Sequence, residues 1–140
     1  MSVLYLLDTN VLSEPLRPRP DTRVLEMLQE HEESLATATI VWHELWYGCS
    51  RLPPSKKREM IERYLEEVVG AHIPLLPYDE RAARWHATER ARLVRIGRTP
   101  AFVDGQIAAI AAVNGLVLVT RNVSDYADFQ GLTVESWHTT

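Results

Sequence analysis

Short apolar runs alternate with longer stretches of helical periodicity along this chain, and few folds accommodate that order. It predicts an α/β fold, with a central, mostly parallel five-stranded sheet that helices cover on both faces. No repeat or linker interrupts the alternation, so the 140 residues are interpreted as one domain. We expect strands at residues 3–8, 34–38, 73–77, 116–120 and 132–136, and helices at 21–31, 39–48, 55–70, 79–96 and 101–113.

The ends of these helices carry capping signals. Asp21, Ser55 and Asp79 each stand where a side-chain oxygen accepts from the first turn of a predicted helix. Thr99-Pro100 is interpreted as the N-cap and first position of the last helix, and Gly115 as the residue that ends it.

The composition is that of an ordered globular protein. Apolar residues make up 46% of the chain and charged residues 24%, which argues against disorder. No apolar run approaches the ~20 residues of a membrane helix, and no export signal is visible at the N-terminus. The one cysteine, Cys49, cannot form an internal disulfide, which fits a reducing compartment. We therefore predict a cytoplasmic protein without membrane contact.

The charge distribution leaves two interpretations open. A formal net charge of −4 is unfavourable for binding nucleic acid, but local clusters matter more than the mean. In the first interpretation the basic clusters are solvated helix faces. In the second they have a function, either as a basic rim around an acidic site or as a docking surface for an acidic partner. They comprise six arginines between residues 81 and 98, the run Lys56-Lys57-Arg58, and Arg17 with Arg19 and Arg23.

Acidic residues stand near the ends of several predicted elements. Asp8 directly follows the first apolar run, Glu44 lies in the helix after the second strand, and Asp104 lies in the first turns of an Ala-rich helix. Asp125 and Asn122 follow the fourth strand. Ligands of open parallel sheets bind beyond the carboxyl ends of the strands, where the strand order reverses. These side chains therefore meet if the first and fourth strands are neighbours.

The oxygen side chains suggest metal-dependent chemistry when they are taken together. Alone, Asp8 could cap a turn, and Glu44, on a largely apolar and therefore buried helix, could pair with an arginine or a histidine. Together the carboxylates form an oxygen-only set suited to Mg²⁺ or Mn²⁺, and metals held in this way hydrolyse phosphodiesters. Thr120 is then expected to support a carboxylate or a metal-bound water. Asn10 and Arg121 are expected to orient Asp8 or to contact phosphate.

Other enzyme classes are disfavoured by what the sequence lacks. It contains no glycine-rich nucleotide-binding loop, no Gly-x-Ser-x-Gly turn and no zinc spacing among its five histidines. A haloacid-type phosphatase would have Asp-x-Asp, but Asp8 is followed by Asn10. A receiver domain would have a lysine after a late strand, whereas the only lysines are Lys56 and Lys57.

Four segments of the chain resemble PIN-domain ribonuclease toxins, the VapC toxins of type II toxin–antitoxin pairs. The continuation Ser13-Glu14-Pro15-Leu16-Arg17-Pro18 is most similar to the Fit-type branch. The resemblance spans nearly the whole chain. Its segments are Leu6-Leu7-Asp8-Thr9-Asn10-Val11-Leu12-Ser13-Glu14, residues 41–48 around Glu44, residues 103–109 around Asp104, and Val119-Thr120-Arg121-Asn122.

The resemblance implies a fold, an activity and partners. The fold would be a single PIN-like α/β/α sandwich over residues 1–140, and the activity a Mg²⁺- or Mn²⁺-dependent endoribonuclease. The protein would form a homodimer and be neutralised by a cognate antitoxin, through which alone it would reach operator DNA. The alternative is a non-catalytic PIN scaffold that acts by dimerisation and by binding the antitoxin and the operator.

The resemblance also assigns site residues. Asp8, Glu44 and Asp104 match the three acidic positions of the family motif, with Asp8 and Asp104 as the primary metal ligands and Glu44 completing the site. The fourth catalytic position falls on either Asn122 or Asp125, because relatives place the acid at either point. The retained acidic set argues against the non-catalytic alternative.

Overall fold

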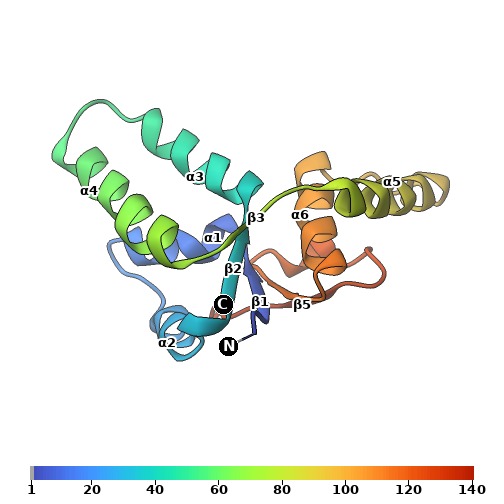
Figure 1. Cartoon of the computed structure of the whole chain (residues 1–140), viewed down its shortest axis with the longest axis horizontal. Coiled ribbons are helices and arrows are strands. Elements are labelled where there is room, and N and C mark those ends of the chain that lie inside the picture. Colours follow the sequence, from blue (N-terminus) through green and yellow to red (C-terminus); the bar gives the residue numbers. More distant parts are fainter. Residues whose placement is uncertain (1) are drawn as a thin grey trace.

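Five parallel strands form one sheet in the order β3-β2-β1-β4-β5 in the computed structural model, which describes residues 2–140 (Figure 1). All four strand pairings are parallel, so the prediction of an α/β protein with a mostly parallel five-stranded sheet is confirmed. The strands are shorter than predicted: β1 Tyr5–Leu7, β2 Leu35–Ala38, β3 Leu75–Leu76, β4 Val117–Val119 and β5 Thr133–Glu135.

Helices flank this sheet. In Figure 1, α3 and α4 form an arm on one side of the strands, and α5 and α6 lie against each other on the other side. The helices are α1 Thr9–Leu12, α2 Thr22–Glu30, α3 Thr39–Ser50, α4 Lys56–Tyr64, α5 Glu80–Arg95 and α6 Phe102–Val113, with the shorter turns η1 Glu14–Leu16, η2 Glu32–Ser34, η3 Leu65–Gly70 and η4 Val123–Tyr126.

The strand order reverses between β1 and β4, at the centre of the sheet. In this register Leu6 lies between Ala36 of β2 and Leu118 of β4. Leu6 and Leu7 point to opposite faces, and both are fully buried, so both faces of the sheet are covered. The adjacency of the first and fourth strands, which the sequence left open, therefore holds.

The predicted caps are confirmed at three helix starts and one helix end. Asp21 accepts from the N–H of Arg23, Ser55 from Arg58, and Asp79 from Ala82. Gly115 follows α6 with a φ of 65°, a left-handed conformation that glycine adopts without strain.

Two details of the helix predictions are wrong. Helix α6 begins at Phe102, after an extended Ala101, and not at Thr99-Pro100. The N-cap is Ala101, whose ψ of 138° lies outside the helical region, so Thr99 and Pro100 both precede the helix. The predicted helix 55–70 is α-helical only to Tyr64, after which η3 is a π-helix.

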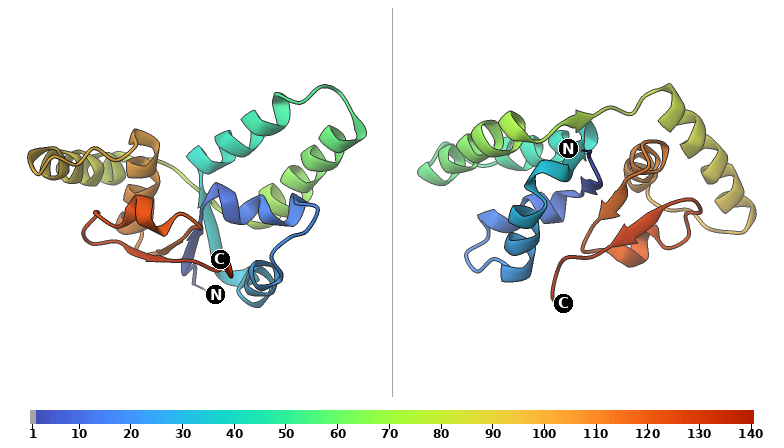
Figure 2. Two further views of the ribbon diagram at one scale, coloured as in Figure 1. Left: turned by 180° about the vertical axis from the view of Figure 1, so that it is seen from behind. Right: turned by 60° about the horizontal axis from the view of Figure 1, so that its bottom comes forward.

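The C-terminal tail returns to the start of α2 (Figure 2). The backbone N–H and the hydroxyl of Thr139 both donate to Asp21 Oδ2 at 2.8 Å, which, with the helix-capping bonds, lowers the pKa of Asp21 to about 2. His138 Nε2 lies 3.2 Å from Glu14 Oε1, and Trp137 is 1% exposed. The tail is therefore part of the packed fold.

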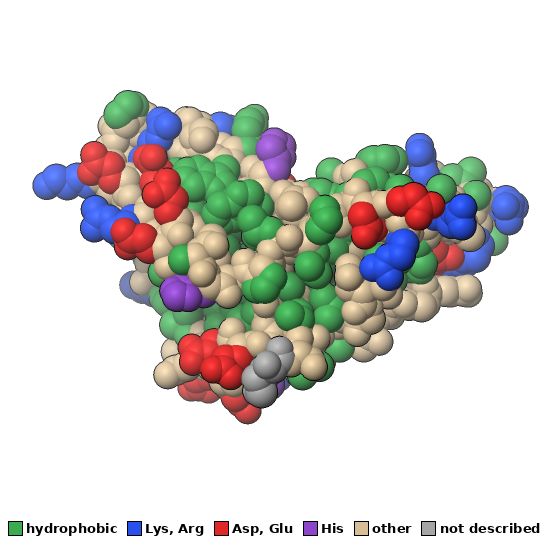
Figure 3. Space-filling model, in the orientation of Figure 1, with side chains coloured by type: hydrophobic (Ala, Val, Ile, Leu, Met, Phe, Trp, Pro, Cys, Tyr) green, Lys and Arg blue, Asp and Glu red, His purple; other side chains and the backbone are tan. Residues whose placement is uncertain are grey.

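Hydrophobic side chains also reach the surface of the α3–α4 arm, and Figure 3 shows a group of them between these helices. Tyr47 is 58% exposed, Met60 52% and Val68 50%. Such residues suit a contact between proteins. The predicted homodimer nevertheless stays a prediction. No helix among residues 2–140 is long and apolar enough to cross a membrane.

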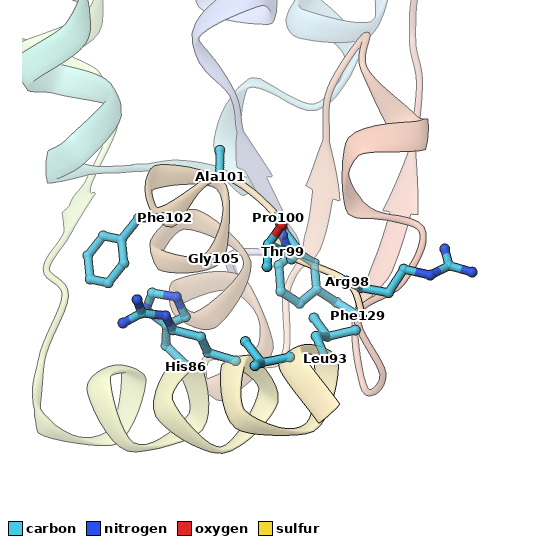
Figure 4. Close-up of a pocket in the computed structure, with 11 residues that line it drawn as sticks. His86, Leu93, Arg98, Thr99, Pro100, Ala101, Phe102, Gly105 and Phe129 are labelled. Atoms are coloured by element: carbon cyan, nitrogen blue, oxygen red, sulfur yellow. The ribbon is translucent and has the colours of Figure 1, made fainter. Parts of the chain in front are cut away.

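Helices α5 and α6 lie in close contact at His86 and Gly105 (Figure 4). A Cβ added to Gly105 would lie 2.2 Å from His86 Nε2. The His86 ring cannot easily turn away, because its Nδ1 is hydrogen-bonded to the Tyr78 hydroxyl at 2.9 Å. Glycine at position 105 is thus required by the packing of the two helices.

We expect Gly105→Ala to lower the free energy of unfolding by about 1–3 kcal/mol, because the added methyl overpacks the contact with His86. Gly48→Ala is the matched control: its Cβ would meet nothing within 4 Å. That change should instead stabilise α3 by about 0.5–1 kcal/mol. Urea unfolding followed by circular dichroism measures both, and equal effects of the two substitutions would contradict the packing argument.

Candidate active site

Asp8 joins the carboxyl ends of β1 and β4. Its N–H donates to the carbonyl of Val119 at 3.0 Å. Oδ1 accepts from the N–H of Thr9 at 2.8 Å and caps α1, while Oδ2 accepts from the hydroxyl of Thr120 at 2.9 Å. The side chain is 7% exposed. Asp8 is thus both a cap and a buried carboxylate at the centre of the sheet edge.

The loop after β4 is held by the side chain of Asn10. Asn10 Nδ2 donates to Thr120 Oγ1 at 3.3 Å, and Asn10 Oδ1 accepts from the N–H of Arg121 at 2.9 Å. The N–H of Asn122 also donates to Thr120 Oγ1, at 3.1 Å. Asn10 and Thr120 therefore orient Asp8 as a pair. Arg121 contributes its backbone to this network, and its guanidinium lies 3.5 Å from Thr140.

Tyr126 is a residue of the site that the sequence analysis missed. Its hydroxyl lies 3.4 Å from Asp8 Oδ2 and 3.4 Å from Asp104 Oδ1, so it spans carboxylates from β1 and α6. Burial and the charges of both carboxylates raise the pKa of Tyr126, which keeps its proton available to them. The only signal in the sequence was its position beside Asp125, and spacing alone does not show that the ring turns inward.

Glu44 and Asp125 lie at the outer side of the site. Glu44 Oε1 accepts from the hydroxyl of Thr9 at 3.4 Å. Glu44 is an exposed residue, which corrects the expectation of a largely buried helix: α3 buries only Val41, Leu45 and Cys49. Asp125 is also exposed.

Asp125 and Asn122 take part in the site in different ways. The charge of Asp125 acts on both Asp8 and Asp104. Asn122 enters the hydrogen-bond network through its backbone N–H. The assignment of the fourth position to Asn122 or to Asp125 stays a prediction.

The four carboxylates destabilise one another. Burial raises the pKa of Asp8 and of Asp104, and the charge of Asp125 raises both further. Partial burial raises the pKa of Glu44, with the charge of Asp8 next in importance. Within residues 2–140, none of the four forms an ion pair with a lysine or arginine. Buried carboxylates without a basic partner are stabilised when a cation binds between them.

The donor chemistry fits Mg²⁺ or Mn²⁺, but the side chains are not arranged around a shared point. Carboxylate oxygens are the ligands that both ions prefer. In the described part of the chain, however, no three His, Cys, Asp or Glu side chains form a ready metal centre. Asp8, Asp104 and Glu44 instead accept hydrogen bonds from the hydroxyls of Thr120, Tyr126 and Thr9. Binding an ion would require them to converge.

The acidic site is separate from the cavity between α5 and α6. That cavity has a volume of about 270 Å³ and lies among His86, Leu93, Phe102 and Phe129 (Figure 4). None of the four carboxylates lines it. The site at the sheet edge is thus not part of this pocket.

Comparisons with known proteins agree with this geometry. The family model described as the PIN domain matches residues 5–128. Toxin FitB of Neisseria gonorrhoeae is 34% identical, over 96% of this chain and 99% of its own. The tRNA(fMet)-specific endonuclease VapC of Shigella flexneri is 31% identical, over 95% of this chain and 97% of its own. A solved structure of FitAB bound to an IR36 DNA fragment is similar with a TM-score of 0.89 and 31% identity, covering 98% of both chains.

Asp104→Asn removes one repelling charge at nearly constant size. Burial and the charges of Asp125 and Asp8 raise the pKa of Asp104, so its ionised form destabilises the fold above the folded pKa, and this cost is absent below the unfolded value of about 3.9. We expect the free energy of unfolding in EDTA at neutral pH to rise by roughly 0.5–2 kcal/mol. The gain should shrink toward zero as the pH falls to about 4.

Urea unfolding across this pH range measures the effect. Asp128→Asn is the control, because Asp128 is paired with Arg98 at 3.1 Å and its neutralisation should bring no gain. A gain for Asp104→Asn that is equal at all pH values would show that repulsion between carboxylates is not its cause.

Proposed function

The chain belongs to the PIN-domain family, in the group of FitB- and VapC-type toxins, and we propose that it is the toxin of a type II toxin–antitoxin system. Its activity would be that of an endoribonuclease that hydrolyses phosphodiester bonds in RNA. The observation that carries this proposal is the gathering of Asp8, Glu44, Asp104 and Asp125 where the strand order reverses, without a basic partner for any of them within residues 2–140.

Asp8 and Asp104 would hold Mg²⁺, or Mn²⁺ in its place, with Glu44 completing the site. The oxygen-only donor set and the absence of ion pairs at these carboxylates in the described chain support this assignment. A bound metal lowers the pKa of water and stabilises negative charge on the leaving oxygen of a phosphodiester.

The other residues of the site would keep the carboxylates in place. Thr120 fixes one oxygen of Asp8, and the N–H of Thr9 fixes the other. Tyr126 links Asp8 to Asp104 and, being 2% exposed, excludes water behind them. Such outer partners orient ligands and are costly to lose.

The partners of the protein follow from the same proposal. RNA is the substrate, a cognate antitoxin is the inhibitor, and operator DNA is reached only through the antitoxin. The protein would work in the cytoplasm, where its RNA substrates are, and would form a homodimer. The half-exposed hydrophobic residues of the α3–α4 arm favour such a dimer. A non-catalytic scaffold would need the same surfaces but no carboxylate cluster.

We expect antitoxin-free protein to cleave RNA with Mg²⁺ or Mn²⁺, and Asp8→Asn and Asp104→Asn to reduce the rate by at least about 100-fold, because each removes a metal ligand. Gel analysis of a mixed panel of transfer, ribosomal and messenger RNA measures this. Glu30→Gln is the control, because Glu30 is exposed at the end of α2 and should leave the rate unchanged.

Two results would contradict this assignment. Cleavage that survives in both Asn variants would place the activity elsewhere or in a contaminant. A folded wild-type protein that binds Mn²⁺ but leaves every RNA in the panel intact would favour the scaffold.

The fourth acidic position can be assigned by two single substitutions. Asp125→Asn should lower the cleavage rate about 10-fold or more, because the charge of Asp125 acts at Asp8 and Asp104. Asn122→Ala should change the rate less than about 3-fold, because Asn122 supports Thr120 through its backbone. Steady-state cleavage at saturating metal distinguishes the two, and the reverse order of effects would assign the position to Asn122.

A further inference from the structure

A basic hollow lies between the α1–α2 connection and the C-terminal tail. Its volume is about 290 Å³, and we call it the arginine pocket after Arg17, Arg19 and Arg121. Arg19 and Arg121 are exposed, and neither forms an ion pair within residues 2–140. The other lining residues are Glu14, Pro20, Asp21, Thr22, His138, Thr139 and Thr140.

The two carboxylates of the arginine pocket are already occupied. Glu14 is 2% exposed and accepts from the N–H of Asp21 at 2.8 Å, with His138 Nε2 at 3.2 Å. Asp21 accepts two hydrogen bonds from Thr139 and caps α2. These bonds hold the walls of the pocket together. Arg17 lies 3.5 Å from Glu14 Oε1, so Arg19 and Arg121 are the arginines of the pocket that form no ion pair within residues 2–140.

The arginine pocket adjoins the acidic site through the loop after β4. Arg121 follows Thr120, whose hydroxyl donates to Asp8 Oδ2 at 2.9 Å. The N–H of Arg121 donates to Asn10 Oδ1 at 2.9 Å, which fixes the start of this side chain. The loop that orients Asp8 therefore also places a guanidinium at the pocket.

RNA needs a basic contact at this place. The chain carries a formal charge of −4, and the acidic site repels phosphates that approach it. The guanidinium of arginine donates two parallel hydrogen bonds to phosphate oxygens. Such contacts position a nucleic acid independently of its base sequence. The threonine hydroxyls of the pocket add neutral donors.

We propose that Arg17, Arg19 and Arg121 bind a backbone phosphate of the RNA substrate beside the bond that is cleaved. This inference rests on the proposed ribonuclease function and adds to it the surface that holds the strand. The pocket discriminates little between sequences, because phosphates are the same in every nucleotide. An acidic protein segment is the competing occupant.

The test measures RNA binding without catalysis. Full-length protein in EDTA is titrated into a fluorescein-labelled single-stranded RNA of about 12 nucleotides, and anisotropy is recorded over a range of salt concentrations. For Arg19→Gln with Arg121→Gln, we expect the dissociation constant to rise on the order of ten-fold. The slope of log K against log salt should fall by about 1.4, at about 0.7 per lost phosphate contact.

Two further variants keep this test specific. Arg84→Gln with Arg95→Gln removes the same charge from exposed positions on α5. This pair should leave the dissociation constant within about two-fold of the wild type and the salt slope unchanged. Arg19→Lys with Arg121→Lys keeps the charge and should restore the slope. Circular dichroism shows whether each variant is folded. In cleavage assays with Mg²⁺, the Gln pair should raise KM more than it lowers kcat.

Three results would overturn the proposal: an unchanged slope in the Gln pair, an equal loss of affinity in the α5 pair, or a Gln pair that loses binding to labelled polyglutamate but not to RNA. Because binding is measured in EDTA, failure of the pocket is distinct from failure of the ribonuclease assignment, which the cleavage panel tests separately.

Discussion

The parallel pairing of β1 with β4 places the backbone of Asp8 within one hydrogen bond of Val119. It also brings the Thr120 hydroxyl to the Asp8 carboxylate across 112 residues of sequence. The strand order reverses at this pair, so the connections on either side of it diverge and leave the carboxyl ends accessible. Asp104 from α6 and Glu44 from α3 reach the same edge because their helices flank these two strands. Without this one pairing the acidic residues would have no common location.

The ionised carboxylates of the candidate site lower the stability of the fold. Asp8 is nearly buried, and the charge that acts on it is that of another carboxylate, Asp125. The ionised form of Asp8 is therefore unfavourable unless a cation is bound. Hydrogen bonds from Thr9, Thr120 and Tyr126 offset part of this cost. A fold with a large packed core can tolerate such local repulsion.

The C-terminal tail and the α1–α2 connection give the acidic edge a basic neighbour. Glu14 and Asp21 hold His138 and Thr139, and the same contacts place three arginines around a hollow beside the loop of Thr120. The arginines of α5 are used differently. Arg92 of α5 is paired with Glu89 at 2.9 Å, and Arg98, which follows α5, is paired with Asp128 at 3.1 Å, so these two arginines serve the packing of their own region.

The sequence by itself determined the elements and the chemistry of the candidate site. Periodicity and capping residues located every strand and the longer helices, because apolar spacing and first-turn hydrogen bonds are local properties. The residue types gave an oxygen-only set in Asp8, Glu44, Asp104 and Asp125. Only the tertiary structure decided that β1 lies beside β4, that Glu44 is exposed, that the charge of Asp125 acts at Asp8 and Asp104, and that Tyr126 joins two carboxylates. Those contacts link residues far apart in sequence, and their geometry depends on how whole strands and helices pack, which no local pattern records.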